Sequence, residues 1–73
     1  MNLSQLEPGG RAVVTEISAD NMRRRLREFG LIKGTEVFCV QRSPLGDPVA
    51  YLIKGAVIAL RNEDSALVQI EIL

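Results

Sequence analysis

The sequence predicts a mainly β domain: a small closed barrel of five short strands, with one α-helix between the first and second strands. Three observations lead to this prediction. Five short runs rich in valine, isoleucine and leucine are separated by glycine, proline or polar corners. Only one segment has the periodicity of an amphipathic helix. With 73 residues the chain is too short for a two-sheet sandwich, and closure would remove the exposed edges of such apolar strands. We therefore expect one domain over residues 1–73.

The first strand and the helix follow each other closely. The turn-forming segment Glu7–Gly10 precedes a strand predicted over Arg11–Ile17. The segment "SADNMRRRLREFGL" comes next, and either Ser18 or Asp20 can cap the start of a helix there. Gly30 stands where a residue in the left-handed conformation commonly ends a helix.

The helix has an apolar side and a basic side. Three apolar residues fall within one sector at helical spacing and are expected to pack on the core: Met22, Leu26 and Phe29. Three arginines lie opposite them: Arg23, Arg24 and Arg27. The cluster can grip phosphate or an acidic partner surface. It can equally be a solvated helix face, and the sequence leaves the two interpretations open.

The rest of the chain consists of short strands joined by tight connections. The two-residue turn Lys54–Gly55 predicts a β-hairpin, and Asn62–Ala66 is a polar connection with room for one helical turn. In the last strand Val68, Ile70 and Ile72 alternate with more polar positions and are expected to share one face. The predicted strands after the helix are Thr35–Arg42, Val49–Ile53, Ala56–Arg61 and Leu67–Leu73.

Composition argues against an enzyme, a metal site and a nucleic-acid binder. With one cysteine and no histidine, the chain can form no internal disulfide and lacks the usual zinc ligands. Cys39 has no histidine to activate it and is expected to be buried. Glu63 and Asp64 are adjacent in a polar connection and are expected to be solvated. Zero net charge and few aromatic residues do not favour nucleic-acid binding.

The same features predict where the protein resides. No apolar run approaches the roughly 18 residues that a membrane-spanning helix needs, and the first residues lack the pattern of a signal peptide. We expect a cytoplasmic protein with no direct membrane insertion. A neutral barrel with few exposed aromatic residues also favours a monomer.

Two features are candidates for a partner surface. Phe38 is exposed if Val37 and Cys39 face the core, and buried if the strand has the opposite parity. The loop "SPLGDPVAY" holds a stiff turn, in which Gly46 supplies a positive φ and Asp47 is expected to bond its own backbone. Pro44 and Pro48 restrict the backbone on both sides of the turn. Leu45 has no reason to be apolar in a turn, so it either tucks under the loop or is presented to a partner.

The order of the elements resembles the FeoA family, the small cytosolic component of bacterial ferrous iron uptake. The matching segments are "RRRLREFGLIKGTEV", "RSPLGDPVAY", "IALR" and "SALVQIEI". The resemblance runs from about Leu6 to Leu73, and it is also found in the C-terminal domain of metal-dependent repressors. It implies an SH3-like barrel.

The resemblance also implies a function. The expected partner is the FeoB-type ferrous iron permease, bound through its G-protein-like cytosolic part, which would place the protein at the inner face of the membrane. The arginines named above, Leu45 and Phe38 are the candidate contacts. No cofactor is expected, and Fe(II) binding would be weak. The alternative is a stand-alone phosphate, nucleic-acid or weak metal-binding module related to the repressor domain.

Overall fold

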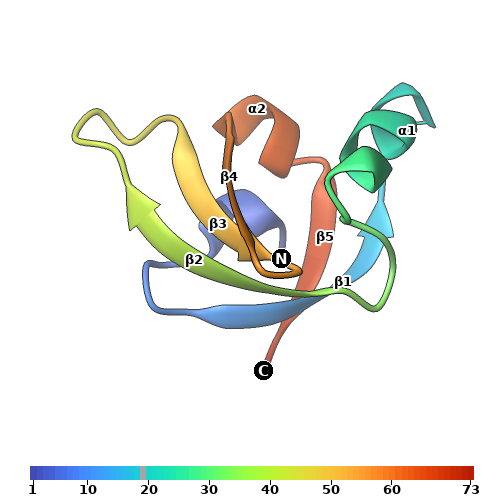
Figure 1. Cartoon of the computed structure of the whole chain (residues 1–73), viewed down its shortest axis with the longest axis horizontal. Helices are drawn as coiled ribbons and strands as arrows, with labels where there is room; N and C mark the ends of the chain where they lie inside the picture. Colours follow the sequence, from blue (N-terminus) through green and yellow to red (C-terminus); the bar gives the residue numbers. More distant parts are fainter. Residues whose placement is uncertain (19) are drawn as a thin grey trace.

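Five antiparallel strands form one strongly twisted sheet, with a helix at one end (Figure 1). The structure is a computed structural model that describes residues 1–18 and 20–73, without the side chains of residues 20–22. The strand order is β4-β3-β2-β1-β5. The strands are β1 (Arg11–Ile17), β2 (Glu36–Arg42), β3 (Val49–Ile53), β4 (Ala56–Leu60) and β5 (Val68–Ile72). The helices are η1 (Leu3–Gln5), α1 (Asp20–Glu28) and α2 (Asn62–Ser65).

The five strands and the position of α1 between β1 and β2 agree with the sequence, but the predicted closure of the barrel is wrong. The strands β4 and β5 stand at opposite ends of the strand order and do not pair within the described part of the chain. The outer edge of β5 is instead occupied by the first residues, because Ile70 N donates to Met1 O at 2.9 Å and Asn2 forms a bridge with Gln69. Backbone groups that would close the barrel are therefore used by the N-terminal segment.

The hairpin β3–β4 has the predicted two-residue turn. Lys54 has φ of 49° and Gly55 has φ of 83°. Both values are positive, as the tight turns that match the twist of a hairpin require. The turn fixes the register, in which Ile53 pairs with Ala56 and Val49 pairs with Leu60.

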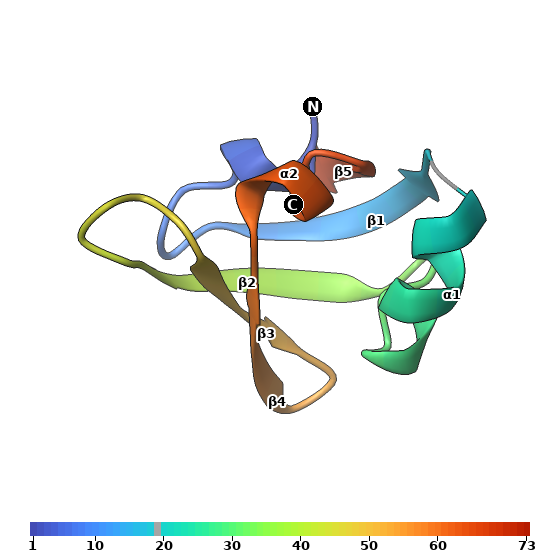
Figure 2. The same ribbon diagram turned by 90° about the horizontal axis from the view of Figure 1, so that it is seen from above.

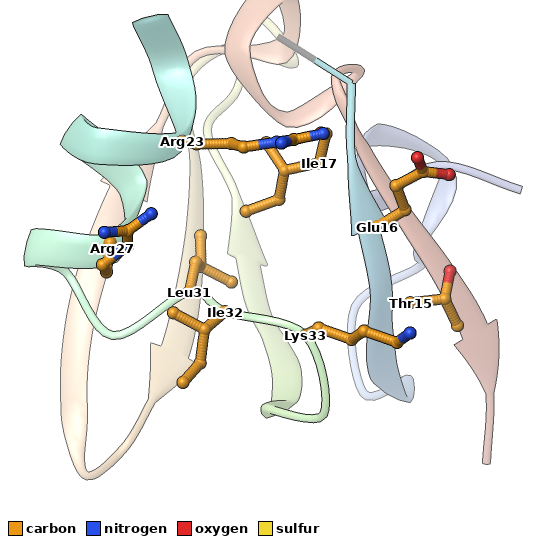
Figure 3. A pocket seen from close by; sticks show the side chains of 8 residues that line it. All are labelled: Thr15, Glu16, Ile17, Arg23, Arg27, Leu31, Ile32 and Lys33. Atoms are coloured by element: carbon orange, nitrogen blue, oxygen red, sulfur yellow. The ribbon is translucent and has the colours of Figure 1, made fainter. Parts of the chain in front are cut away.

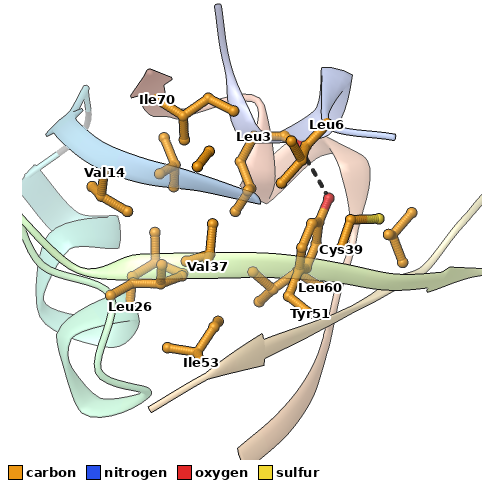
Figure 4. Close-up of a cluster of buried hydrophobic side chains, with 14 of the residues drawn as sticks. Leu3, Leu6, Val14, Leu26, Val37, Cys39, Tyr51, Ile53, Leu60 and Ile70 are labelled. Atoms are coloured by element: carbon orange, nitrogen blue, oxygen red, sulfur yellow. Dashed lines mark hydrogen bonds between the residues drawn. The ribbon is translucent and has the colours of Figure 1, made fainter. Parts of the chain in front are cut away.

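The core lies inside the curved sheet and is mainly aliphatic (Figure 4). Its largest residue, Tyr51 on β3, is completely buried, and its hydroxyl donates to the Leu3 carbonyl at 3.2 Å. Leu3 belongs to η1, which the sequence did not predict. The side chain of Asn2 accepts from Ser4 N, and Gln5 Oε1 accepts from Asn2 N at 2.9 Å, which makes a capping box around this short helix.

The helix α1 packs on the core differently from the prediction. Leu26 and Leu31 are buried, but Phe29 is 37% exposed, so its assignment to the core is wrong. Gly30, with φ of 92°, ends the helix as predicted. Leu31 N donates to Leu26 O and Gly30 N donates to Arg27 O, which is the pattern of a Schellman cap. Leu31, which follows the reversal at Gly30, is completely buried and belongs to the core in place of Phe29.

Two further predictions concern side chains at the edges of the core. Of the three residues predicted to share one face of the last strand, Val68 and Ile70 are buried, whereas Ile72 is exposed at the end of β5. The predicted core role of Met22 and the cap by Asp20 lie outside the described side chains.

Candidate partner-binding surface

The loop between β2 and β3 is a compact, well-bonded turn. Gly46 N donates to Ser43 O at 2.8 Å, and Ser43 N donates to Pro48 O at 3.3 Å. Gly46 has φ of 84°, which confirms its predicted positive φ. The bond between Asp47 and Pro48 is cis. Pro44 and Pro48 thus flank a turn whose shape is set by backbone hydrogen bonds.

The loop is also attached to α2 by two side-chain hydrogen bonds. The sequence did not predict this attachment. Asp47 Oδ1 accepts from Asn62 N at 3.0 Å. Asp47 therefore bonds the first turn of α2, and the prediction that it bonds its own loop backbone is wrong. In return, Asn62 Nδ2 donates to Gly46 O at 2.9 Å. The two bonds span 15 and 16 positions of sequence, so no local pattern could have predicted them. They hold the loop against the helix.

Leu45 lies at the tip of this loop and is 95% exposed. Of the two alternatives left open by the sequence, the structure therefore selects presentation to solvent. The turn does not need an apolar side chain at this position. A pre-ordered loop also loses little conformational entropy when its tip is buried by a partner.

Phe38 lies on the outer face of the sheet, because its neighbours Val37 and Cys39 are buried. It is 38% exposed, which settles the parity of β2. The guanidinium of Arg11 lies 6.0 Å from the ring centroid, and Arg11 Nε is 3.3 Å from Glu36 Oε1. The ring is thus partly covered by a neighbouring ion pair.

The arginines of α1 differ in what they contact and in whether they line a pocket. Arg23 Nε donates to Ile17 O at 2.9 Å and so ties the helix to β1. Arg23 and Arg27 line a pocket between α1 and β1, to which Lys33 also contributes (Figure 3). Arg24 is exposed and, unlike Arg23 and Arg27, does not line this pocket. The sequence did not indicate Lys33, because the turn that carries it is brought to the helix only by the fold.

The candidate residues occupy different parts of the molecule. The β2–β3 loop, which carries Leu45, and the helix α1 lie at opposite ends of the longest axis, which extends 30 Å (Figures 1 and 2). Phe38 lies on the sheet between them. The structure therefore brings Arg23 and Arg27 together, but it separates them from Leu45.

The chemically reactive groups are buried. Burial raises the pKa of the Cys39 thiol and that of the Tyr51 hydroxyl. Among the residues that the structure describes, no three carboxylates or cysteines gather as metal ligands would. Likewise, no helix in the described part of the chain is long and apolar enough to cross a membrane.

Comparison with known proteins decides the family. A profile of the FeoA domain matches residues 1–72. The chain belongs to the FeoA family. It is 36% identical over 74 residues to a Porphyromonas gingivalis protein described as a fusion of Fe(2+) transport protein A with the Fe(2+) transporter FeoB. That match covers 100% of this FeoA chain but only 9% of the relative.

Solved FeoA structures have the same fold. FeoA from Chlorobium tepidum is 35% identical with a TM-score of 0.92, and the match covers 100% of this chain and 70% of that one. Stenotrophomonas maltophilia FeoA, described as an SH3 domain protein complexed with zinc, is 34% identical with a TM-score of 0.83. The match covers 97% of this chain and 89% of that protein. A manganese-dependent transcriptional repressor, at 18% identity and a TM-score of 0.89, shares the fold. The SH3-like architecture is thus confirmed.

Proposed function

We propose that this FeoA-family chain is a non-enzymatic accessory protein of ferrous iron uptake that binds the cytosolic part of a FeoB-type transporter. The observation that carries the proposal is the P. gingivalis relative, in which a counterpart of the whole chain is fused to FeoB. Fusion keeps two partners at a high effective concentration. The fusion therefore supports an association between the FeoA domain and the transporter.

Leu45 is our proposed anchor for this association. A fully exposed leucine on a hydrogen-bonded loop offers apolar area whose burial favours binding, and the loop is already ordered before binding. Anchors of this kind commonly contribute about 1–3 kcal/mol when they enter a pocket of the partner.

The test is a titration of ¹⁵N-labelled protein with the soluble nucleotide-binding domain of the FeoB transporter from the same organism, with and without guanine nucleotide. We expect amide shifts around Ser43–Pro48 and at least tenfold weaker binding for Leu45→Ser. The matched control is Val57→Ser, which removes another exposed aliphatic side chain, 65% exposed and on β4.

Two results would contradict the proposal at different levels. If the wild-type protein shows no shift at millimolar partner concentration, binding to this domain is wrong. If Leu45→Ser and Val57→Ser bind as well as the wild type, the transporter is a partner but Leu45 is not its anchor.

A further inference from the structure

The pocket between α1 and β1 has a volume of about 510 Å³ and lies where β2 diverges from β1. One wall is the helix, which contributes Arg23 and Arg27. The other wall is the C-terminal half of β1, and the floor is the turn that follows the helix (Figure 3). The helix that forms one wall is at the opposite end of the molecule from the β2–β3 loop (Figures 1 and 2).

The turn at the floor holds Lys33 in place. Thr35 N donates to Ile32 O at 3.0 Å, and the Thr35 hydroxyl donates to Gly30 O at 3.0 Å. Gly34 N donates to Val14 O at 2.7 Å, which fastens the turn to β1. The backbone of Lys33 is therefore fixed beside β1, and its side chain extends along β1 on the side of the pocket opposite Arg27 (Figure 3).

The charge of the pocket is mainly positive. Arg23 donates to the Ile17 carbonyl and so positions the wall. Arg27 and Lys33 make no ion pair with another described residue. Glu16 also borders the pocket, but in Figure 3 its carboxylate points away from the helix. Among the described residues that line the pocket, Glu16 is the one acidic side chain, so a ligand with a negative charge would meet Arg27 and Lys33 without having to displace it.

The rest of the lining is aliphatic. Ile17 and Leu31 are buried beneath the pocket, and Ile32 is 41% exposed in it. None of the described residues that line the pocket is aromatic, so they provide no stacking platform for a nucleobase. Cations beside an aliphatic surface match a peptide in which a carboxylate stands next to an aliphatic side chain.

We propose that this pocket binds a short acidic segment of a protein partner, with one carboxylate at Arg27, a second at Lys33 on the opposite side of the pocket, and an aliphatic side chain on Ile32, which lies between them (Figure 3). The identification of that partner as the FeoB-type transporter rests on the proposed function. The existence of the acidic-peptide site does not depend on the proposed function. The site and the proposed function can therefore be tested separately.

The probe is the peptide acetyl-Asp-Leu-Glu-Leu-Asp-amide, titrated into ¹⁵N-labelled protein at low salt. Its control is the peptide in which Asn and Gln replace the acids. We expect millimolar binding with shifts confined to the amides of β1, α1 and the turn Ile32–Thr35, and at least fivefold weaker binding of the amide peptide. Binding should also weaken as salt is raised.

A matched pair of variants separates the pocket from the general charge of the helix. Arg27→Glu and Arg24→Glu change the net charge equally, and both residues are exposed on α1. Arg27→Glu should weaken binding of the acidic peptide at least fivefold, whereas Arg24→Glu should change it less than twofold. Equal losses in the two variants, equal binding of the two peptides, or no shift at the pocket would each overturn the inference.

The same two variants are then titrated with the FeoB nucleotide-binding domain. If the peptide binds in the pocket but the wild-type protein does not bind this domain, the proposed function fails and the acidic-peptide site stands. If the domain binds but the peptide does not, the proposed function stands and the site is wrong.

Discussion

The two ends of the long axis differ in what they present and in how they are held. At one end the loop Ser43–Pro48 presents an apolar tip and is fixed by hydrogen bonds to α2. At the other end α1 presents arginines around a pocket and is fixed by the buried pair Leu26 and Leu31. Hydrogen bonds thus hold the loop that presents Leu45, whereas buried leucines hold the helix that presents the arginines. The difference implies that the two ends respond to different mutations.

The largest effect is expected at the helical end. Leu26→Ala removes a fully buried side chain and should lower the free energy of unfolding by about 2–5 kcal/mol. Phe29→Ala, one turn further on and partly exposed, should cost about 1 kcal/mol. Urea denaturation of both variants would measure the difference. A larger loss for Phe29→Ala would restore this residue to the core and contradict the packing of α1.

The core between the two ends should respond to alkaline pH. Burial raises the pKa of Tyr51 above its ordinary value of 10.0, so the folded state favours the neutral phenol. The neutral Tyr51 hydroxyl contributes fully to stability below the pKa that it has in the unfolded chain. This contribution is lost as the pH rises through the higher pKa that it has in the folded protein. In that window stability should fall by about 1.4 kcal/mol per pH unit.

Tyr51 is the only tyrosine and the chain has no tryptophan, so absorbance near 295 nm follows its ionisation directly. The protein should unfold as the phenolate appears. A Tyr51→Phe variant should lose this part of the alkaline dependence. Reversible titration of the folded protein near pH 10 would show that the hydroxyl is not buried.

Alanine substitutions at Gly30 and Gly46 would compare the backbone strain at the two ends of the molecule. Gly30 and Gly46 both have positive φ, so alanine at either position is strained by about 1–2 kcal/mol. At Gly30 a new Cβ would also lie 3.1 Å from Lys54 Cδ, whereas nothing lies within 4 Å at Gly46. Gly30→Ala should therefore be the more destabilising by thermal denaturation. The reverse order would mean that the loop is the more strained end.

The attachment of the loop to α2 should have a smaller effect. Asn62→Ala removes the bond to Gly46 O and should cost about 1 kcal/mol. Hydrogen exchange of the Gly46 amide should accelerate, while that of the α1 amides should not. The control Glu63→Ala alters an exposed side chain of the same helix and should change stability by less than about 0.5 kcal/mol.

The smallest effect on stability is expected at the tip itself. Leu45→Ser changes a side chain that is 95% exposed, so unfolding should shift by no more than about 0.5 kcal/mol. A midpoint in urea equal to that of the wild type would show that any loss of binding reflects the surface. A clear destabilisation would mean that Leu45 packs under the loop.

The sequence by itself determined the order of elements, the helix end at Gly30 and the tight turn Lys54–Gly55. These features depend on local conformation and on periodicity, which neighbouring residues fix. It also determined that the loop turns at Gly46, and it predicted a buried Cys39, although the parity of β2 was settled only by the structure.

Only the tertiary structure decided the rest, because these features depend on how the elements pack together and not on local sequence pattern. The predicted closed barrel is an open sheet, because Met1 and Asn2 occupy the edge of β5. Asp47 bonds Asn62 and not its own turn, Leu31 replaces Phe29 in the core, and Lys33 joins Arg27 at one pocket. The separation of Leu45 from the arginines has the same cause: the two are placed by different parts of one sheet, whose twist carries them to opposite ends.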